Sequence, residues 1–146
     1  MKFAIQMGIA CMFSCALMAS AQTQKLDDAA IAQILKNYSE SWVTTDPITR
    51  RVKIQDIWVE TATHESPFGL SEGREAINKE VEGFIQAFPN SQIQLTLLQR
   101  TGNHLLCNFV VTKPDGSLVL RGMDYFEITE KGLLKKAVGF VQQQGG

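Results

Sequence analysis

The stretch from Ala62 to Ile77, Ala-Thr-His-Glu-Ser-Pro-Phe-Gly-Leu-Ser-Glu-Gly-Arg-Glu-Ala-Ile, constrains the fold of this chain more than any other segment. It follows a helical apolar pattern and predicts a short strand over about residues 60–65. A turn at residues 66–69 and the start of another helix near Gly73 come next. This order of elements is typical of a small domain in which helices cover one face of a sheet.

The first 21 residues are typical of a secretory signal peptide. Lys2 precedes an apolar run over residues 3–18, which is too short and too rich in Ala, Gly and Ser to favour a membrane anchor. Small residues at positions 19–21 then form a cleavage pattern. We therefore expect one mature domain over residues 22–146, periplasmic or secreted, with no membrane partner after cleavage.

The cysteines and the net charge bear on disulfides, lipid anchoring and nucleic-acid binding. Cleavage before Gln22 removes Cys11 and Cys15 and leaves Cys107 without a disulfide partner in the chain. The alternative is a lipoprotein anchored through Cys15, although the Met-Phe-Ser before it is a poor recognition sequence. The formal net charge of the 146 residues is −1, which gives no basic surface for nucleic acid.

The first half of the mature chain predicts three helices. Asp27 or Asp28 caps the first, Asp46 with Pro47 begins the second, and the third ends before Pro89. The positions expected to face the core are Ile31, Ile34, Leu35, Tyr38 and Trp42, then Ile48, Val52, Ile57 and Trp58, then Ile77, Val81, Phe84, Ile85 and Phe88.

The second half alternates between apolar and polar residues and predicts four antiparallel strands. Turns are expected at residues 101–103, 114–116 and 130–132. The predicted class is therefore α+β, in which three N-terminal helices pack on a curved, mainly antiparallel sheet. That sheet consists of the short strand and a four-strand meander.

This order of elements resembles the nuclear transport factor 2-like superfamily, which includes ketosteroid isomerases, SnoaL-like polyketide cyclases and scytalone dehydratases. The likeness rests on residues 62–69, the helix start at 73–77, the Gly-Met-Asp-Tyr-Phe sequence at 122–126, and Gly132. The resemblance implies a cone-shaped fold whose apolar interior holds a small molecule. Because relatives commonly dimerise through the outer sheet face, it also suggests a homodimer as one arrangement.

Ketosteroid isomerase offers the sharpest comparison within this group. Its helix Tyr matches Tyr38 and its neutral strand Asp matches Asp124, and both hydrogen-bond a developing oxyanion in that family. Its carboxylate base precedes the proline of the turn, where this chain has Ser66. Serine is no base at neutral pH without help, so the resemblance argues against a faithful isomerase.

His64 is the residue that could take over proton transfer. Residues 64 and 66 share one side of an extended strand, and histidine titrates near neutral pH. We therefore predict a cluster of Tyr38, His64 and Asp124 in the cavity. The alternative for His64 is a polar residue at a strand edge that hydrogen-bonds to backbone or water.

Asp124 and Tyr38 have structural alternatives as well. Asp124 lies on an apolar strand face, where a carboxylate must be protonated or paired, for example with Arg74, Arg100 or Arg121. Tyr38 lies on the apolar stripe of its helix and fits the core equally well.

Six further residues are predicted to line the ligand pocket: Trp42, Trp58, Ser66, Phe68, Phe84 and Asn108. The spacing of the two histidines and Cys107 is not that of metal ligands, and no phosphate-binding loop occurs, so we expect no metal and no cofactor.

Three functions remain open. The first is an exported protein that binds a small apolar or carbonyl-containing ligand. The second is a cofactor-independent isomerase, dehydratase or cyclase that uses Tyr38 and Asp124 as hydrogen-bond donors and His64 as acid or base. In the third, side chains fill the cone and the sheet face mediates assembly.

Overall fold

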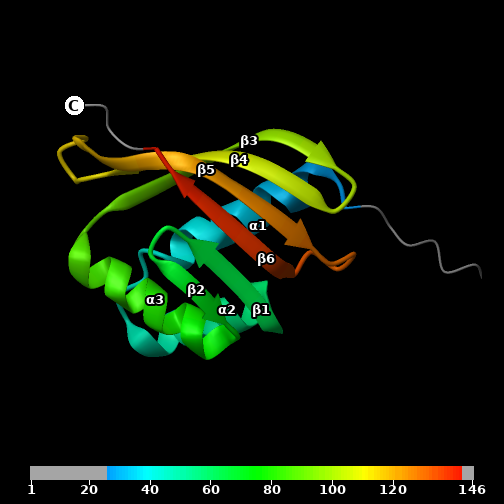
Figure 1. Ribbon diagram of the computed structural model, residues 1–146, viewed down its shortest axis with the longest axis horizontal. Coiled ribbons are helices and arrows are strands. Elements are labelled where there is room, and N and C mark those ends of the chain that lie inside the picture. The colour runs from blue at the N-terminus through cyan, green and yellow to red at the C-terminus, as the bar shows by residue number, and fades with distance from the viewer. Residues whose placement is uncertain (1–25, 143–146) are drawn as a thin grey trace, which may run out of the picture.

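The computed structural model describes residues 26–142; the expected leader over residues 1–21, with Cys11 and Cys15, lies outside this range. Three helices and six strands alternate along the chain (Figure 1). They are α1 (Asp28–Ser41), α2 (Pro47–Ile57), β1 (Trp58–Ser66), β2 (Gly69–Glu72), α3 (Arg74–Ala87), β3 (Gln92–Thr101), β4 (His104–Thr112), β5 (Leu118–Ile128) and β6 (Leu134–Val141). The predicted α+β class is confirmed.

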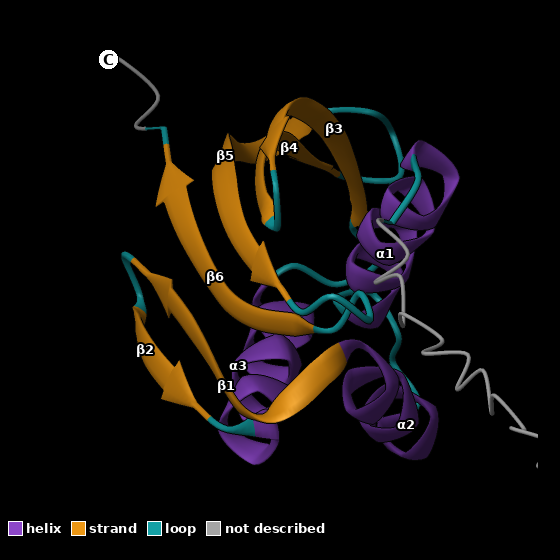
Figure 2. Ribbon diagram, turned by 90° about the vertical axis from the view of Figure 1, so that its right-hand side faces the viewer, coloured by secondary structure: helices purple, strands orange, loops and turns teal. Residues whose placement is uncertain are grey.

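The strands form a single sheet in the order β2-β1-β6-β5-β4-β3. β1 runs parallel to β6, and all the other neighbouring pairs are antiparallel. The sheet is strongly bent, and the helices lie along its concave side (Figure 2). The parallel pairing of β1 with β6 brings the segment around His64 next to the end of the meander.

The beginnings of the helices follow from local chemistry. The Asp27 carboxylate accepts a hydrogen bond from the backbone N–H of Ala30 at 2.8 Å and caps α1. Asp46 does the same for Thr49 at 2.8 Å, with Pro47 in the first turn of α2. Both starts are as predicted.

Strand β2 is an element that the sequence analysis did not predict. Gly69–Glu72 pairs antiparallel with residues 63–66 of β1, so the expected short strand is one arm of a hairpin. Gly69 has a φ of +143°, a backbone conformation that favours glycine and that reverses the chain here. Four residues offered too short an alternating pattern to predict a strand.

The expected core face of α2 was wrong at Ile48 and Val52, whereas Ile57 is buried as predicted. Ile48 is 76% exposed and Val52 is 50% exposed, because the buried residues of this helix are Arg50, Ile54 and Ile57 on its opposite side. Trp58 is fully buried as expected, but it begins β1 and is not part of the helix. The face was misassigned because one of its buried residues is Arg50, and a charged residue does not indicate a core position.

The core fills the space between the helices and the inner sheet face. It includes Ile31, Leu35, Ile54, Trp58, Ile77, Val81, Leu105, Phe126, Ile128 and Leu134. No helix within residues 26–142 has the length and apolar character needed to span a membrane.

Candidate functional site

A cavity of about 390 Å³ opens on the concave side of the sheet, between the sheet, α1 and α3. Its wall is almost entirely apolar, with six aromatic residues: Tyr38, Trp42, Phe68, Phe84, Phe88 and Phe109. Four other polar side chains reach it: His64, Ser66, Glu80 and Asp124. The space is in the range of small-molecule sites in proteins, so the cone is not filled by its own side chains.

Asp124 faces this cavity from β5 and is 6% exposed. None of the three arginines considered as partners pairs with it: Arg74 donates to the Trp58 carbonyl, Arg100 donates to the carbonyls of Gly102 and Leu26, and Arg121 is exposed. Burial raises the pKa of Asp124 to about 6, while the charge of His64 and a hydrogen bond with Tyr38 act in the opposite direction. Asp124 therefore keeps a proton to a higher pH than an ordinary carboxyl group.

The backbone of β6 makes room for this carboxyl group. Gly139 pairs with Asp124 across the two strands, and a Cβ at position 139 would lie 3.1 Å from the Asp124 Oδ1. A glycine at this position therefore lets the carboxyl group lie close against the strand.

Tyr38 enters the same space from α1. Its ring packs edge-on against Phe126 at 4.8 Å, which fixes its direction. Burial, followed by the charges of Asp124 and Glu80, raises the pKa of its hydroxyl well above the ordinary value. The hydroxyl therefore stays protonated and can donate a hydrogen bond over the whole neutral range.

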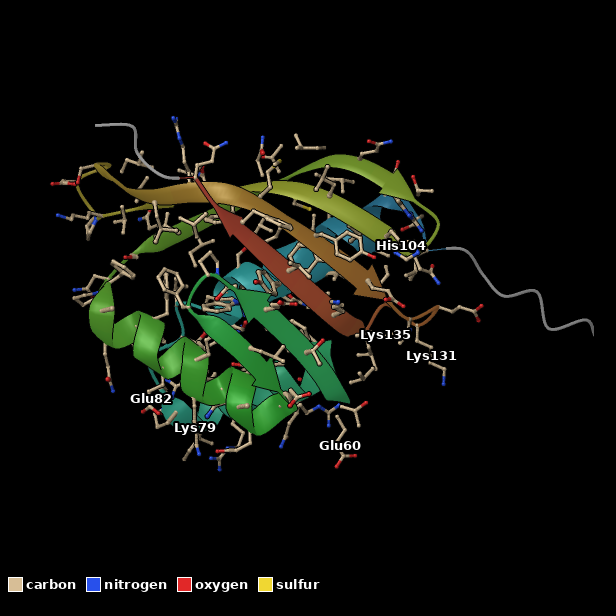
Figure 3. The ribbon with its side chains drawn as sticks, in the orientation of Figure 1. Glu60, Lys79, Glu82, His104, Lys131 and Lys135 are labelled. Carbon is tan, nitrogen blue, oxygen red and sulfur yellow. The ribbon has the colours of Figure 1, made fainter. Side chains whose placement is uncertain are left out.

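His64 lies on β1 and is held by Glu80 of α3. The two Glu80 oxygens are 2.8 and 2.9 Å from the His64 Nδ1, and the Ser66 hydroxyl donates a weaker bond to Glu80 at 3.4 Å. Lys79 and Glu82, the neighbours of this segment of α3, point away from the interior (Figure 3). The predicted cluster of Tyr38, His64 and Asp124 thus shares one cavity.

Glu80 is the site residue that the sequence analysis missed. A signal for it existed, because Glu80 follows Ile77 by three residues and precedes Phe84 by four. That spacing places the Glu80 carboxylate on the apolar stripe of α3, just as the Asp124 carboxylate lies on the apolar face of its strand. Glu80 is a charged residue on an otherwise apolar stripe, and such a residue signals a buried polar site.

Two indole N–H groups near this cluster have no hydrogen-bond partner within residues 26–142, those of Trp42 and Trp58. Trp42 lines the cavity and is 7% exposed, whereas Trp58 is buried behind it. The Trp42 ring is confined by His64 at 5.2 Å and by Phe84 at 5.4 Å. Both indole nitrogens are themselves buried, so neither N–H group is open to a ligand in the cavity.

The other predicted pocket residues divide into two groups. Trp42, Ser66, Phe68 and Phe84 line the cavity. The expectation for Asn108 was wrong: this side chain is exposed, because Cys107 and Phe109 on either side of it occupy the inner face of β4. Trp58 belongs to the core and not to the cavity wall.

His104 and Cys107 take no part in the cavity. The exposed His104 ring stacks on Tyr125 and its Nδ1 lies 2.7 Å from the tyrosine hydroxyl at the far end of the sheet (Figure 3). Cys107 is buried beside Asp124, and burial followed by that charge raises the pKa of its thiol to about 12. In the described part of the chain, no three His, Cys, Asp or Glu side chains are grouped to hold a metal ion.

Comparison with solved structures identifies the fold. A candidate isomerase of the SnoaL-like family from Agrobacterium tumefaciens superposes with a TM-score of 0.72 at 25% identity, over 79% of this chain and 99% of that one. The chain therefore has the fold of the nuclear transport factor 2-like proteins, and among the solved structures it is similar to those with a SnoaL-like domain.

Other SnoaL-like and nuclear transport factor 2-like structures agree at the level of the fold. A candidate SnoaL-like polyketide cyclase from Jannaschia sp. CCS1 gives a TM-score of 0.63 at 14% identity, over 77% of this chain and 85% of that one. A nuclear transport factor 2-like protein of unknown function from Exiguobacterium sp. 255-15 gives 0.60 at 15% identity, over 79% and 99%. Searches with protein-family models and with curated sequences give no match.

Proposed function

We propose that this SnoaL-like protein is exported and binds a small, uncharged, largely apolar molecule that carries a carbonyl or similar acceptor group. The observation that supports this most is the aromatic cavity of about 390 Å³, with its polar groups gathered around Tyr38, His64 and Asp124. An apolar wall with a few converging polar groups is the usual form of a small-molecule site.

The charges of the wall favour an uncharged ligand over an anionic one. Glu80 and Asp124 both reach the cavity, and no lysine or arginine of residues 26–142 lines it. A carboxylate or phosphate ligand would have to lose its hydration next to two carboxyl groups. Donors, by contrast, are present in the Tyr38 hydroxyl and in the protonated form of Asp124.

Binding is tested with three compounds of similar size: 1-tetralone, its carbonyl-free analogue tetralin, and the anion 1-naphthoate. The change in tryptophan fluorescence reports occupancy of the cavity beside Trp42. We expect 1-tetralone to bind more tightly than tetralin and 1-naphthoate to bind least. Failure of both neutral compounds to bind, or tightest binding of the anion, would overturn the proposal.

Variants localise the binding. Phe84→Ala and Trp42→Ala remove large parts of the apolar wall and should each weaken 1-tetralone binding more than His64→Ala does. Isothermal calorimetry follows the Trp42 variant, because its fluorescence signal is lost. Equal effects of the three changes would contradict binding through apolar contact, and Asn108→Ala on the outer face serves as the control.

Catalysis is the second candidate, favoured by a specific observation. Asp124 is a buried carboxyl group that none of the three candidate arginines neutralises, since Arg74 and Arg100 bond to backbone carbonyls and Arg121 is exposed. Such a group suits a cofactor-independent isomerase, dehydratase or cyclase in which Tyr38 and protonated Asp124 donate to a carbonyl oxygen and His64 moves protons. On any substrate that turns over, Asp124→Asn should abolish the reaction, and full activity of that variant would exclude this role.

A further inference from the structure

The ring of Phe109 on β4 reaches sideways across the sheet to a position where a side chain is missing. Phe109 pairs with Gly122 of β5, and a Cβ at position 122 would lie 2.7 Å from the Phe109 Cζ and 2.8 Å from its Cε1. Side chains of a strand normally stand roughly perpendicular to the sheet. Because the far edge of this ring occupies the place of its neighbour's side chain, the ring lies along the sheet surface.

Glycine is the residue that fits beneath this ring. A larger residue at position 122 would meet the far edge of the Phe109 ring and also the backbone carbonyl of Phe140 in β6. Leu120 and Asp124, the inward-facing residues on either side of Gly122 along β5, both line the cavity. The Phe109 ring therefore fills the gap between two cavity-lining side chains and forms a flat part of the cavity floor.

A second glycine on the inner sheet face has a similar effect, since Gly139 of β6 leaves room for the Asp124 carboxyl group to lie close against that strand. The opposite side of the cavity is formed by Trp42 of α1 and Phe84 of α3. A Phe109 ring that stood upright on the sheet would project toward these helices. The depth of the cavity between the sheet and the helices therefore depends on the position of the Phe109 ring.

We propose that Phe109 is a specificity-determining residue of this cavity: by lying over Gly122 it sets the thickness of the ligand, so that the site selects flat molecules over globular ones of equal size. The proposal rests on the proposed function, because the cavity must bind an uncharged carbonyl compound. Phe109 acts through shape and apolar contact, and the face of its ring offers a stacking surface to a flat ligand.

The position of the ring is tested first without a ligand. We expect strong ¹H–¹H NOEs between the Hα protons of Gly122 and the Hζ and Hε protons of Phe109, because the far edge of the ring lies where a Cβ of residue 122 would be. The variant Phe109→Leu assigns these signals by their disappearance. Absence of the NOEs in the wild-type protein would overturn the proposal.

The selection is tested with 1-tetralone and 2-adamantanone. Both are uncharged ketones with the same number of carbon atoms, but 1-tetralone is a nearly flat fused-ring molecule and 2-adamantanone is a compact cage. We expect the wild-type protein to bind 1-tetralone about tenfold or more tightly than 2-adamantanone, since apolar pockets discriminate to this degree against a misfit of a single carbon atom. Isothermal calorimetry measures both dissociation constants.

Variants locate the selection at Phe109. Phe109→Val removes the ring and deepens the cavity, so it should shift the ratio of the two dissociation constants toward 2-adamantanone by about tenfold or more. Phe109→Leu, which retains more buried apolar surface, should shift the ratio in the same direction by a smaller factor. A loss of stability alone would weaken the binding of both ketones alike and leave the ratio unchanged.

Phe140→Val is the matched control, because it makes the same change at a residue that is 54% exposed. The neighbours of Phe140 on β6, Gly139 and Val141, both line the cavity, so alternation along the strand places Phe140 on the outer face. The ratio of the two dissociation constants should stay at the wild-type value in this variant. A shift as large as that of Phe109→Val would contradict selection by the cavity floor.

The two proposals fail in different ways. If 1-tetralone binds but the wild-type protein does not prefer it, the binding function stands and selection by Phe109 is refuted. The same conclusion follows if the preference exists but neither Phe109 variant alters it. If neither ketone binds, the proposed function is overturned and selection by Phe109 is overturned with it.

Discussion

The interior of this molecule contains two buried polar clusters that differ in one respect. Around Arg50, each nitrogen of the guanidinium has a protein partner: Nε donates to Asn78 at 3.1 Å, Nη1 donates to the carbonyls of Thr44 and Thr45 at 3.2 Å, and Nη2 forms an ion pair with Glu82 at 3.7 Å. Around Asp124, the polar side chains instead line a cavity of about 390 Å³ whose wall is otherwise almost entirely apolar. The first cluster is satisfied within the protein, whereas the second borders the space that the proposed ligand would occupy.

This difference separates structural from functional burial. The free energy that buried polar groups cost is recovered in the Arg50 cluster by hydrogen bonds between α2, α3 and the loop before α2. In the Asp124 cluster it is recovered in part only, which leaves interaction energy available to a ligand. Changes in the two clusters should therefore affect different measurements, stability for one and binding with its pH dependence for the other.

The largest expected effect is on stability, from Arg50→Met. This change leaves the Asn78 side chain and two backbone carbonyls without their donor, and we expect the free energy of unfolding to fall by about 3 to 5 kcal/mol. Urea denaturation measures it. The neighbouring Arg51→Met, which removes only an exposed pair with Glu75, should cost less than about 1 kcal/mol. Equal losses would mean that the Arg50 cluster is not the stronger structural unit.

The next effect is a pH dependence that belongs to Asp124. Its folded-state pKa of about 6 lies above the ordinary 3.8, so the folded protein binds the proton more tightly than the unfolded chain does. Asp124 therefore contributes most to stability below about pH 4, and this contribution is lost as the pH rises through about 6. The loss amounts to about 2 to 3 kcal/mol.

Asp124→Asn removes this titration and serves as the test. The stability of the variant relative to the wild-type protein should increase from pH 4 to pH 7, as measured by urea unfolding at unit intervals. Because other carboxyl groups titrate equally in both proteins, the difference isolates position 124. Parallel stability curves would show that folding does not raise the pKa of Asp124.

A smaller effect is expected from Gly139→Ala. The new methyl group would lie 3.1 Å from the Asp124 Oδ1 and displace that carboxyl group by a few tenths of an ångström. We expect a loss of about 1 kcal/mol in stability and a several-fold weaker binding of 1-tetralone. Gly83→Ala is the control for stability alone, because its Cβ meets no atom within 4 Å although Gly83 lines the cavity, and it should stabilise by about 0.5 to 1 kcal/mol. Unchanged binding in Gly139→Ala would show that Asp124 does not contact the ligand.

The smallest effect is expected at Asn108. This exposed residue lies on the outer sheet face, so Asn108→Ala should change stability by less than about 0.5 kcal/mol and leave 1-tetralone binding unchanged. Calorimetric titration checks both expectations against the wild-type protein. A marked loss of binding would mean that the outer face contributes to the site after all.

The elements that the sequence predicted are those with a complete local signal. α1 and α2 have capping aspartates, the meander has alternating residues between clear turns, and the position of Asp124 on an apolar strand face pointed to the cavity. The signals that failed were mixed or short. α2 carries a buried arginine on its core stripe, β2 has four residues, and Glu80 interrupts an otherwise apolar helix face.

The partner of His64 could not be predicted because it is a tertiary contact. His64 and Glu80 come together because α3 packs back against β1. The path of the chain between them depends on the hairpin formed by β1 and β2. Asn108, by contrast, could have been placed correctly from the sequence. Its neighbours Cys107 and Phe109 are apolar members of an alternating strand, so alternation alone puts Asn108 on the opposite, exposed face.

The buried thiol of Cys107 can report how often the sheet opens locally. Its thiol is buried on the inner sheet face, where Cys107 of β4 pairs with Asp124 of β5. Reagents such as maleimides therefore cannot reach it until the meander opens. The rate at which this thiol is modified in native buffer therefore reports how often β4 and β5 separate. A ligand that fills the adjoining cavity would slow that rate in proportion to its occupancy, which provides a screen for ligands that needs no substrate turnover.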